Sequence, residues 1–449
     1  MKKRKFLKLS SALITGSTLA PLVGCNTKVS SDPIKNWAGN LTYGTSSIFE
    51  PTTVEEVSEV ITRCNKATVL GTRHCFNRIA DSSDNLISTR LLNKVISLDT
   101  ASRKVTVESG TRYGELCTYL DQRGFAIHNL ASLPHISVAG ACATATHGSG
   151  AANGNLATAV SAIELVKADG EFVTLSRDTD PEFSGVVVGL GALGLVTKVT
   201  LDLIPAFQMR QDVYLNLPMA QLEAHFGEIM SAGYSVSLFT DWQTQSINQV
   251  WIKSTVSEGA PAAASPEFFG ATLATRNVHP IIEISAENCT EQMGVPGPWY
   301  DRLPHFKLDF TPSSGEELQA EYFVPYESAV EAIKAVDTLR AQIGPLLLIT
   351  EIRAIDEDNL WMSPCYRQRS VTIHFTLKQD VAGVTNLLPL IEEKLAPFNA
   401  KPHWGKLFIL GSRVLQSRYA KLQNFKQLAT RYDPEGKFRN DFLNSTIFA

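Results

Sequence analysis

The 449-residue sequence contains no internal repeat, no low-complexity tract and no Cys-x-x-Cys pair. Beyond the first eight residues it has no basic run, and its net charge is −4, so nucleic-acid binding is disfavoured. The apolar run 9–23 is too short and too rich in Ser and Thr to span a bilayer stably. The remaining composition, with 44% hydrophobic and 19% charged residues, indicates a globular protein of two domains or one large composite.

The N-terminus has the pattern of an export signal. Basic residues at 2–5 precede the apolar run, which ends in Leu22-Val23-Gly24-Cys25 and resembles a bacterial lipoprotein cleavage box with Cys25 as the acylated residue. An ordinary signal peptide with a chance cysteine is the alternative. Residues 3–8 also resemble a twin-arginine export signal in which Lys replaces one Arg. We therefore expect an exported bacterial protein, either periplasmic or held at a membrane through this lipid anchor alone.

The other cysteines form no tight disulfide framework. Their even number permits disulfides in an exported protein, but their spacing gives no recognisable pattern. They are Cys64, Cys75, Cys117, Cys142, Cys289 and Cys365. Cys64 and Cys117 lie on apolar faces of expected helices, where we expect buried free thiols.

A histidine on a turn after a buried strand is the first candidate for chemistry. Thr53-Val54-Glu55-Glu56 is a capping box that begins a helix, and the helix leads to an apolar strand at 67–70. Gly71 permits a sharp turn there, which presents His74 with little steric cover. Taken alone, such a histidine is more often a hydrogen-bonded loop residue than a functional one. Further strands are expected at 95–98, 104–109, 159–167, 172–175 and 195–204, and further helices at 113–123 and 328–343.

Polar side chains interrupt three expected strands in the second half of the chain. Because successive side chains of a strand alternate between its faces, Glu351 and Arg353 share a face with Ile349. An exposed ion pair on a solvated sheet face is an alternative explanation of this strand. Three such strands together favour a polar-lined cavity. In the other two strands, the residues that share a face are Thr372, His374 and Thr376 (371–377), and Trp404, Lys406 and Phe408 (403–410).

Two segments of the first half resemble the flavin-cradling segments of a known superfamily. The first is Val69-Leu70-Gly71-Thr72-Arg73-His74-Cys75-Phe76, and the second runs from 132 to 150. From about Asn36 to its C-terminus the chain resembles the vanillyl-alcohol-oxidase superfamily with its PCMH-type FAD-binding domain, most closely the alditol (xylitol and sorbitol) oxidases. The resemblance includes four shorter motifs: Asn36-Trp37-Ala38-Gly39-Asn40, Asn288-Cys289-Thr290-Glu291-Gln292, His403-Trp404-Gly405-Lys406 and Asp433-Pro434-Glu435-Gly436-Lys437-Phe438.

This resemblance implies an α+β, two-domain PCMH-type FAD-binding fold with a mixed α/β substrate (cap) domain. We expect a signal peptide at 1–25, a tether at 26–35 and the FAD-binding domain at 36–205. The cap domain then spans 206–402, and residues 403–449 return to the FAD-binding domain. We expect a monomer.

The resemblance implies FAD as the cofactor, bonded covalently to the histidine of the first segment, here His74. Small residues from 137 to 145 let backbone amides approach a pyrophosphate closely. No G-x-G-x-x-G loop follows a strand in this region, which argues against a nicotinamide enzyme. Arg73 and Ala145 stand where the family more often has glycine, and Cys75 where it has serine. The matching flavin contacts are Val69, Leu70, Gly71, Thr72, Arg73, Cys75, Ser132, Ser137, Gly140, Thr144, Ala145, Thr146, His147, Val196, Arg353 and His403.

The reaction that the resemblance implies is oxidation of the terminal hydroxyl of an alditol to the aldose, with oxygen reduced to hydrogen peroxide. A polyol is a row of hydroxyl groups, so its pocket needs matched polar and charged partners. Ala131, a small residue at a position associated with oxygen access, favours an oxidase over a dehydrogenase. The matching substrate contacts are Ser132, Glu351, Arg353, Thr376 and Lys406.

Four residues are assigned to catalysis, and no metal is expected. They are Glu351, Arg353, His374 and Lys406. Reduced flavin carries negative charge, so we expect the cations Arg353 and Lys406 beside it. His374 has the ordinary pKa best suited to accept the hydroxyl proton, with neutral Lys406 or a carboxylate-linked water as alternatives.

Two other functions stay open at this point. The Glu-x-Arg and His-Trp-Gly-Lys pieces also resemble the aldonolactone (gulono-, galactono- or arabinono-lactone) oxidases and dehydrogenases of the same superfamily. A lipoprotein that binds sugars for uptake is the non-enzymatic alternative, and it would be colourless.

Overall fold

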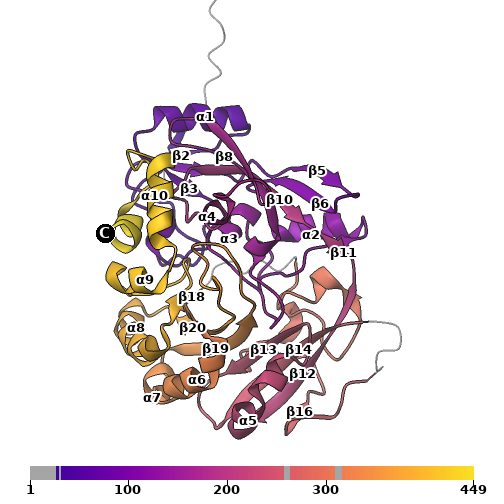
Figure 1. Cartoon of the computed structure of the whole chain (residues 1–449). Coiled ribbons are helices and arrows are strands. Elements are labelled where there is room, and N and C mark those ends of the chain that lie inside the picture. The colour runs from indigo at the N-terminus through magenta and orange to yellow at the C-terminus, as the bar shows by residue number, and fades with distance from the viewer. Residues whose placement is uncertain (1–26, 30–31, 257–262, 309–315) are drawn as a thin grey trace, which may run out of the picture.

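The computed structural model describes residues 27–29, 32–256, 263–308 and 316–449, so the expected signal peptide and lipid-attachment residue lie outside the described part. Two regions lie one above the other in Figure 1. The upper region holds the N-terminal strands and the C-terminal helices, and the lower region holds the largest sheet. None of the helices in the described ranges combines the length and apolar character that crossing a membrane requires.

The upper region contains two larger sheets and a two-stranded one, β11-β7. The first has the strand order β1-β2-β4-β3, and the second is antiparallel with the order β5-β6-β10-β8-β9. Apolar residues of β6, β8, β10 and α2 pack together into one core. The elements are β1 (Thr27–Val29), β2 (Ser47–Phe49), β3 (Thr68–Leu70), β4 (Leu86–Ser88), β5 (Val95–Asp99), β6 (Lys104–Glu108), β7 (Phe125–Ala126), β8 (Val160–Val166), β9 (Phe172–Ser176), β10 (Leu195–Asp202) and β11 (Ile204–Pro205), with helices α1 (Val54–Arg63), α2 (Tyr113–Asp121), α3 (Val138–Ala143) and α4 (Phe183–Val186).

The predicted unit of helix, strand and turn before His74 is present. The Thr53 hydroxyl accepts a hydrogen bond from the backbone N–H of Glu56 and so caps α1, as the capping box predicts. The Glu56 carboxylate also accepts from the backbone N–H of Thr52. After α1 the chain enters β3, which pairs in parallel with β4 and ends where Gly71 begins the turn.

A ten-stranded sheet dominates the lower region. Its order is β15-β16-β12-β14-β13-β19-β20-β18-β21, with β17 paired to β12. Helices α5, α6, α7 and α8 lie along one side of this sheet in Figure 1, and their apolar residues share a core with it. The opposite face carries the polar residues. The elements are β12 (Gln208–Pro218), β13 (Ser235–Thr240), β14 (Ser246–Thr255), β15 (Glu267–Phe268), β16 (Ala271–Leu273), β17 (Gly297–Pro298), β18 (Glu317–Pro325), β19 (Leu347–Ile355), β20 (Ser370–Lys378), β21 (Lys401–Pro402), α5 (Met219–Met230), α6 (Ala329–Asp337), α7 (Arg340–Ile343) and α8 (Val381–Leu395).

The C-terminal helices pack against the upper region. They are α9 (Ser412–Arg418), α10 (Leu422–Tyr432) and α11 (Asp441–Leu443), and the buried side of α10 joins the upper core. The Asp433 carboxylate accepts the backbone N–H groups of Lys437 and Phe438. This turn directs Nζ of Lys437 to the backbone oxygens of Ile61 and Ala168. The Asp433–Phe438 motif therefore joins the chain end to the upper region.

Two predicted elements differ from the structure. The helix expected at 328–343 is divided into α6 and α7, because Leu339 leaves helical geometry between them. The strand expected at 403–410 is wrong: β21 ends at Pro402, and the backbone N–H of Lys406 bonds the carbonyl of His403 to close a turn. Trp404 consequently packs in the upper core and does not share a face with Lys406. The six cysteines among the described residues are free thiols, and Cys64 and Cys117 are buried as predicted.

Candidate functional site

The polar face of the large sheet brings the predicted residues together. Strands β13, β19, β20 and β18 are neighbours, and their register places Phe239, Glu351, His374 and Glu321 side by side in one row. Cross-strand partners point to the same face of a sheet. The predicted alternation in β19 and β20 is therefore confirmed, because the other two aligned rows are Ser237, Arg353, Thr372 and Phe323, and Ile349, Thr376 and Gln319.

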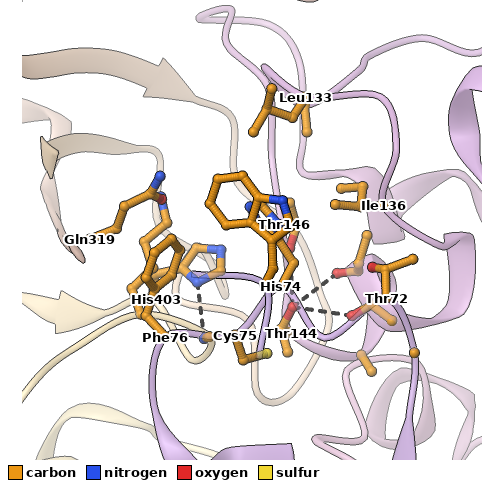
Figure 2. A pocket seen from close by; sticks show the side chains of 18 of the residues that line it. Thr72, His74, Cys75, Phe76, Leu133, Ile136, Thr144, Thr146, Gln319 and His403 are labelled. Carbon is orange, nitrogen blue, oxygen red and sulfur yellow. Dashed lines mark hydrogen bonds between the residues drawn. The ribbon is translucent and has the colours of Figure 1, made fainter. Parts of the chain in front are cut away.

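A cavity of about 560 Å³ lies between this face and the upper region. A cavity of that size suits a cofactor or a small ligand. Figure 2 shows Gln319 and His403 on one side of it, Thr72 and Ile136 on the other, and His74 between them. Of the predicted flavin contacts, Ser137 and Ala145 do not line the cavity. Those that do line it, together with the predicted substrate and catalytic residues, are Val69, Leu70, Gly71, Thr72, Arg73, His74, Cys75, Ser132, Gly140, Thr144, Thr146, His147, Val196, Glu351, Arg353, His374, Thr376, His403 and Lys406.

The Asn36–Asn40 motif fastens the loop that carries His74. The Asn36 amide donates to the carbonyl of Cys75 at 3.0 Å, and the Asn40 amide donates to the carbonyl of Phe76 at 3.1 Å. The Trp37 ring lies over the His74 ring, with 4.4 Å between the centroids. The backbone N–H of Trp37 also donates to the carbonyl of Arg73 at 2.8 Å, so the loop is held on both sides of His74.

His74 is held as a neutral ring. Its Nδ1 lies 3.3 Å from Nε2 of His135. Burial, His135 and Lys406 together lower the pKa of His74 to about 3. A neutral imidazole keeps a free nitrogen lone pair, which a histidine needs in order to form a covalent bond to a cofactor.

The His403–Lys406 motif is tied to the same loop. Asn77 donates its amide hydrogens to the carbonyls of Trp404 and Lys406, at 2.8 and 2.7 Å. The backbone N–H of Phe76 donates to the carbonyl of Gly405 at 2.8 Å. Lys406 therefore reaches the cavity from a loop held against the His74 segment, and not from a strand face.

A buried carboxylate that the sequence analysis did not single out joins the cations of the site. Glu321 accepts from Nζ of Lys406 at 2.6 Å and from Arg353 at 3.1 Å, and it lies 3.2 Å from Nε2 of His147. Burial alone raises the pKa of Glu321, but Lys406, His147 and Arg353 hold that pKa well below its ordinary value. Period-two alternation of polar residues at 317, 319 and 321 is the signal that finds this face of β18.

Glu351 also contacts Arg353, and its other partner is His305. Its Oε1 accepts from Nε2 of His305 at 2.6 Å, and Nε of Arg353 lies 3.5 Å from the same oxygen. Burial alone raises the pKa of Glu351, but Arg353 and His305 hold the pKa below its ordinary value, so the carboxylate is ionised. Arg353 also donates to the Ser132 hydroxyl at 3.3 Å, which links the sheet to the upper region. His305 could not be predicted from the sequence, because an isolated loop histidine gives no periodic signal.

Three side chains of the site lie close enough together to be considered as metal ligands. Donor atoms of His147, Glu321 and His403 lie within 4.8 Å of one another. Glu321, however, already pairs with both Lys406 and Arg353. Two positive charges on the carboxylate disfavour a further cation at this place.

The wall formed by the upper region fits the FAD expected from the sequence. A Cβ atom at Gly71 or Gly140 would lie 2.9 or 2.8 Å from the Ser137 hydroxyl, so glycine at both positions lets the two wall segments pack closely around Ser137. Among the described residues the buried hydroxyls of Ser137 and Ser109 have no hydrogen-bond partner. The segments at 69–75 and 139–147 are the ones that would hold the cofactor.

Both departures from glycine occur at left-handed backbone positions. Arg73 has φ of 62° and Ala145 has φ of 53°. A residue with a Cβ atom pays about 1–2 kcal/mol in this conformation. Ala145 is buried in the upper core, where it shapes the turn after α3 from behind the cavity wall.

Family models match both halves of the site. A model described as FAD binding domain matches residues 45–176, and one described as D-arabinono-1,4-lactone oxidase matches residues 315–446. Alditol oxidase of Streptomyces sp. is 44% identical over 420 residues, which are 93% of this chain and 99% of that protein. L-gulono-1,4-lactone dehydrogenase of Mycobacterium tuberculosis is 27% identical, over 92% of this chain and 98% of that protein.

Solved structures match the whole architecture. Cholesterol oxidase from B. sterolicum aligns with a TM-score of 0.75 and 15% identity, over 95% of this chain and 98% of that chain. A solvent-stable cholesterol oxidase aligns with a TM-score of 0.73 and 16% identity, over 92% of this chain and 96% of that chain. These likenesses, together with the match to the FAD binding domain model, confirm the predicted α+β PCMH-type FAD-binding fold.

Proposed function

The chain belongs to the alditol oxidase family of FAD-dependent oxidoreductases, and we propose that it oxidises the terminal hydroxyl of an alditol such as xylitol or sorbitol to the aldose, reducing oxygen to hydrogen peroxide. One observation carries this proposal. One cavity is lined both by His74 and by the predicted substrate contacts Ser132, Glu351, Arg353, Thr376 and Lys406. Together they supply the anion, cations and hydroxyls that a row of substrate hydroxyl groups requires.

The residues that line the cavity have separate roles in this reaction. FAD, when bound, supplies the acceptor for the hydride from the terminal carbon. Arg353 and Lys406 stabilise negative charge on the substrate oxygen as its proton leaves. Glu351 and Thr376 bind neighbouring hydroxyl groups and orient the terminal carbon.

We propose His374 as the acceptor of the hydroxyl proton. Burial and Lys406 lower its pKa to about 3, so the ring is neutral before the reaction. The lowered pKa also makes the ring a weaker base, so it depends on the two neighbouring carboxylates when it takes the proton. Among the described residues neither of its ring nitrogens has a hydrogen-bond partner. It lies in the row between Glu351 and Glu321, and both carboxylates stabilise the imidazolium that forms.

Oxygen consumption and peroxide formation test the reaction. We expect the purified protein to turn over xylitol and sorbitol and to form one peroxide for each polyol oxidised. Activity on gulono- and galactono-lactones without activity on polyols would instead support the aldonolactone alternative, which the match at 315–446 favours. Polyol oxidation that proceeds with an artificial dye but not with oxygen would contradict the oxidase assignment.

We also propose that FAD is bonded to His74 and that the protein is exported and anchored through Cys25. The fixed, neutral imidazole of His74 supports the first part, and the N-terminal sequence pattern supports the second. Expression of the full chain in a bacterium, followed by membrane fractionation, tests the anchor. We expect wild type in the membrane fraction and the Cys25→Ser variant outside it; equal distributions would contradict the anchor.

A further inference from the structure

A buried lysine, Lys253, lies on β14, which is separated from the Glu351 strand β19 by β13 alone. Lys253 on β14 is 1% exposed, and its charge pairs directly with no carboxylate among the described residues. Its Nζ atom lies 2.6 Å from the carbonyl of Leu303, 2.9 Å from that of Pro304 and 3.2 Å from Nδ1 of His305. A buried ammonium group is costly unless each N–H is used, and here three acceptors meet three N–H groups.

The position of the proton on His305 follows from this count. Carbonyl oxygens only accept, so two of the three Lys253 hydrogens go to Leu303 and Pro304, and the third goes to Nδ1 of His305. The Nδ1 atom therefore carries no hydrogen. The single ring hydrogen sits on Nε2 and is donated to Oε1 of Glu351 at 2.6 Å.

A neutral Lys253 reverses this arrangement. Its two remaining N–H groups stay with the carbonyls, and its lone pair faces Nδ1 of His305, which then holds the ring hydrogen. Nε2 of His305 loses its hydrogen and turns a lone pair toward the Glu351 carboxylate. The charge of Lys253 therefore decides whether Nε2 of His305 donates a hydrogen bond to Glu351.

Packing on both sides prevents the His305 ring from rotating to exchange its two nitrogen atoms. It packs edge-to-face against Phe239 at 5.5 Å and Trp251 at 5.3 Å between centroids. Its carbonyl accepts from the backbone N–H of Thr290, and the Thr290 hydroxyl donates to the carbonyl of Pro304. The Asn288–Gln292 motif therefore fixes the His305 loop against the sheet.

We propose that Lys253 and His305 are positioning residues for polyol oxidation: the Lys253 ammonium fixes the tautomer of His305, and His305 fixes the Glu351 carboxylate so that its second oxygen meets the substrate. Oε2 of Glu351 supports this, because it lies 3.9 Å from Nδ1 of His374, too far for a hydrogen bond. The inference rests on the proposed function, since it assigns the substrate to the Glu351 carboxylate.

The titration of this network gives the proposal a pH signature. Burial lowers the pKa of Lys253 to about 7, with Glu351 and Cys289 raising it and Arg353 and Arg302 lowering it further. Burial and Lys253 lower the pKa of His305 to about 4, so the ring stays neutral above that value. We therefore expect kcat/KM for a polyol to fall as Lys253 loses its proton in mildly alkaline solution.

Steady-state oxidation of xylitol by the flavin-loaded protein, from pH 6 to pH 9, tests the inference with four variants. Lys253→Met should lower kcat/KM by about 10- to 100-fold at pH 6.5 and remove the alkaline fall. His305→Gln should keep part of the activity, because its amide donates to Glu351 without a tautomer to set. In the double variant, Lys253→Met should then add little to the loss caused by His305→Gln. Lys401→Met is the matched control, since Lys401 is another buried lysine whose Nζ donates to a backbone carbonyl, outside the cavity.

Two results would overturn the inference while polyol oxidation by wild type stands. One is a Lys253→Met variant with the kcat/KM and pH profile of wild type; the other is a double variant whose loss is the product of the two single losses. If Lys253→Met does not fold, the pH profile of His305→Gln decides, because an alkaline fall equal to that of wild type contradicts the tautomer link. A wild-type protein that oxidises no polyol would refute the proposed function itself.

Discussion

Nζ of Lys406 lies 2.6 Å from Oε2 of Glu321, a residue 85 positions earlier in the chain. The same carboxylate also accepts from Arg353. Lys406 comes from a loop bonded both to the His74 segment and to β18, and Arg353 comes from β19, so Glu321 joins cations from two separate segments. Held in this way, Arg353 and Lys406 can stabilise the negative charge that forms on the substrate.

Replacing Glu321 with Gln should destabilise the protein and lower polyol turnover. The change leaves Arg353 and Lys406 without their shared anion, and breaking a buried ion pair in this way typically costs about 3–5 kcal/mol. Thermal unfolding should show a melting temperature lower by roughly 3–5 °C. Glu317→Gln is the control, since Glu317 lies on the same face of β18 but hydrogen-bonds Gln319. Equal melting temperatures for the two variants would contradict the role given to Glu321.

Glu351→Gln should lower kcat/KM for xylitol by about 10- to 100-fold, because a charge-assisted hydrogen bond to the substrate is lost. We expect kcat to fall at least as much as the affinity. Glu392 gives a matched comparison: it is a buried glutamate that accepts from the Tyr322 hydroxyl, away from the cavity. A folded Glu392→Gln variant should keep wild-type kcat/KM. Wild-type kinetics in Glu351→Gln would place that carboxylate outside the substrate site.

His74→Ala should abolish covalent flavin. Wild type, denatured on a gel and treated with acid, should give a fluorescent band under ultraviolet light, and the variant should give none. His279→Ala serves as the control, because His279 also lines the cavity. It should keep the band. A fluorescent band in His74→Ala would show that another residue is the anchor.

The stability of the protein should depend on pH through Lys253. Its pKa is about 7 in the folded protein and 10.5 for an ordinary lysine, so between these values the unfolded chain binds a proton that the folded chain does not. The free energy of unfolding therefore rises with pH across this window, by up to about 1.4 kcal/mol for each pH unit from this group.

Melting temperatures at pH 7.5 and pH 9.5 measure this effect. The difference between wild type and Lys253→Met should shift in favour of wild type at the higher pH. The exposed Lys378, which donates to the carbonyl of Pro345, provides the comparison. Lys378→Met should show no such shift. A Lys253→Met difference that stays constant between the two pH values would mean that Lys253 keeps an ordinary pKa.

Local patterns predicted the parts of the site that lie within one segment. The strand before His74 and the turn at Gly71 were visible because both depend on neighbouring residues. The shared face of Glu351 and Arg353 followed from the period of a strand. Lys406 was predicted at the cavity from a strand that does not exist; it reaches Glu321 because Asn77 holds its loop.

The partners of these residues could not be read in the same way. Glu321 is 32 positions from Arg353, and His305 is 46 positions from Glu351. Lys253 gave no signal at all, because a lone lysine in an apolar strand does not reveal which acceptors surround it.

The sequence by itself determined the faces of β19 and β20 and the turn that carries His74, since each depends on residue order along a short stretch. It also determined the family, through motifs spread along the chain. Only the tertiary structure decided which charged side chains pair with each other and which nitrogen of the His305 ring carries the hydrogen. Those properties depend on distances of about 3 Å between segments that meet through sheet register and loop anchoring, and residue order along one strand does not specify such distances.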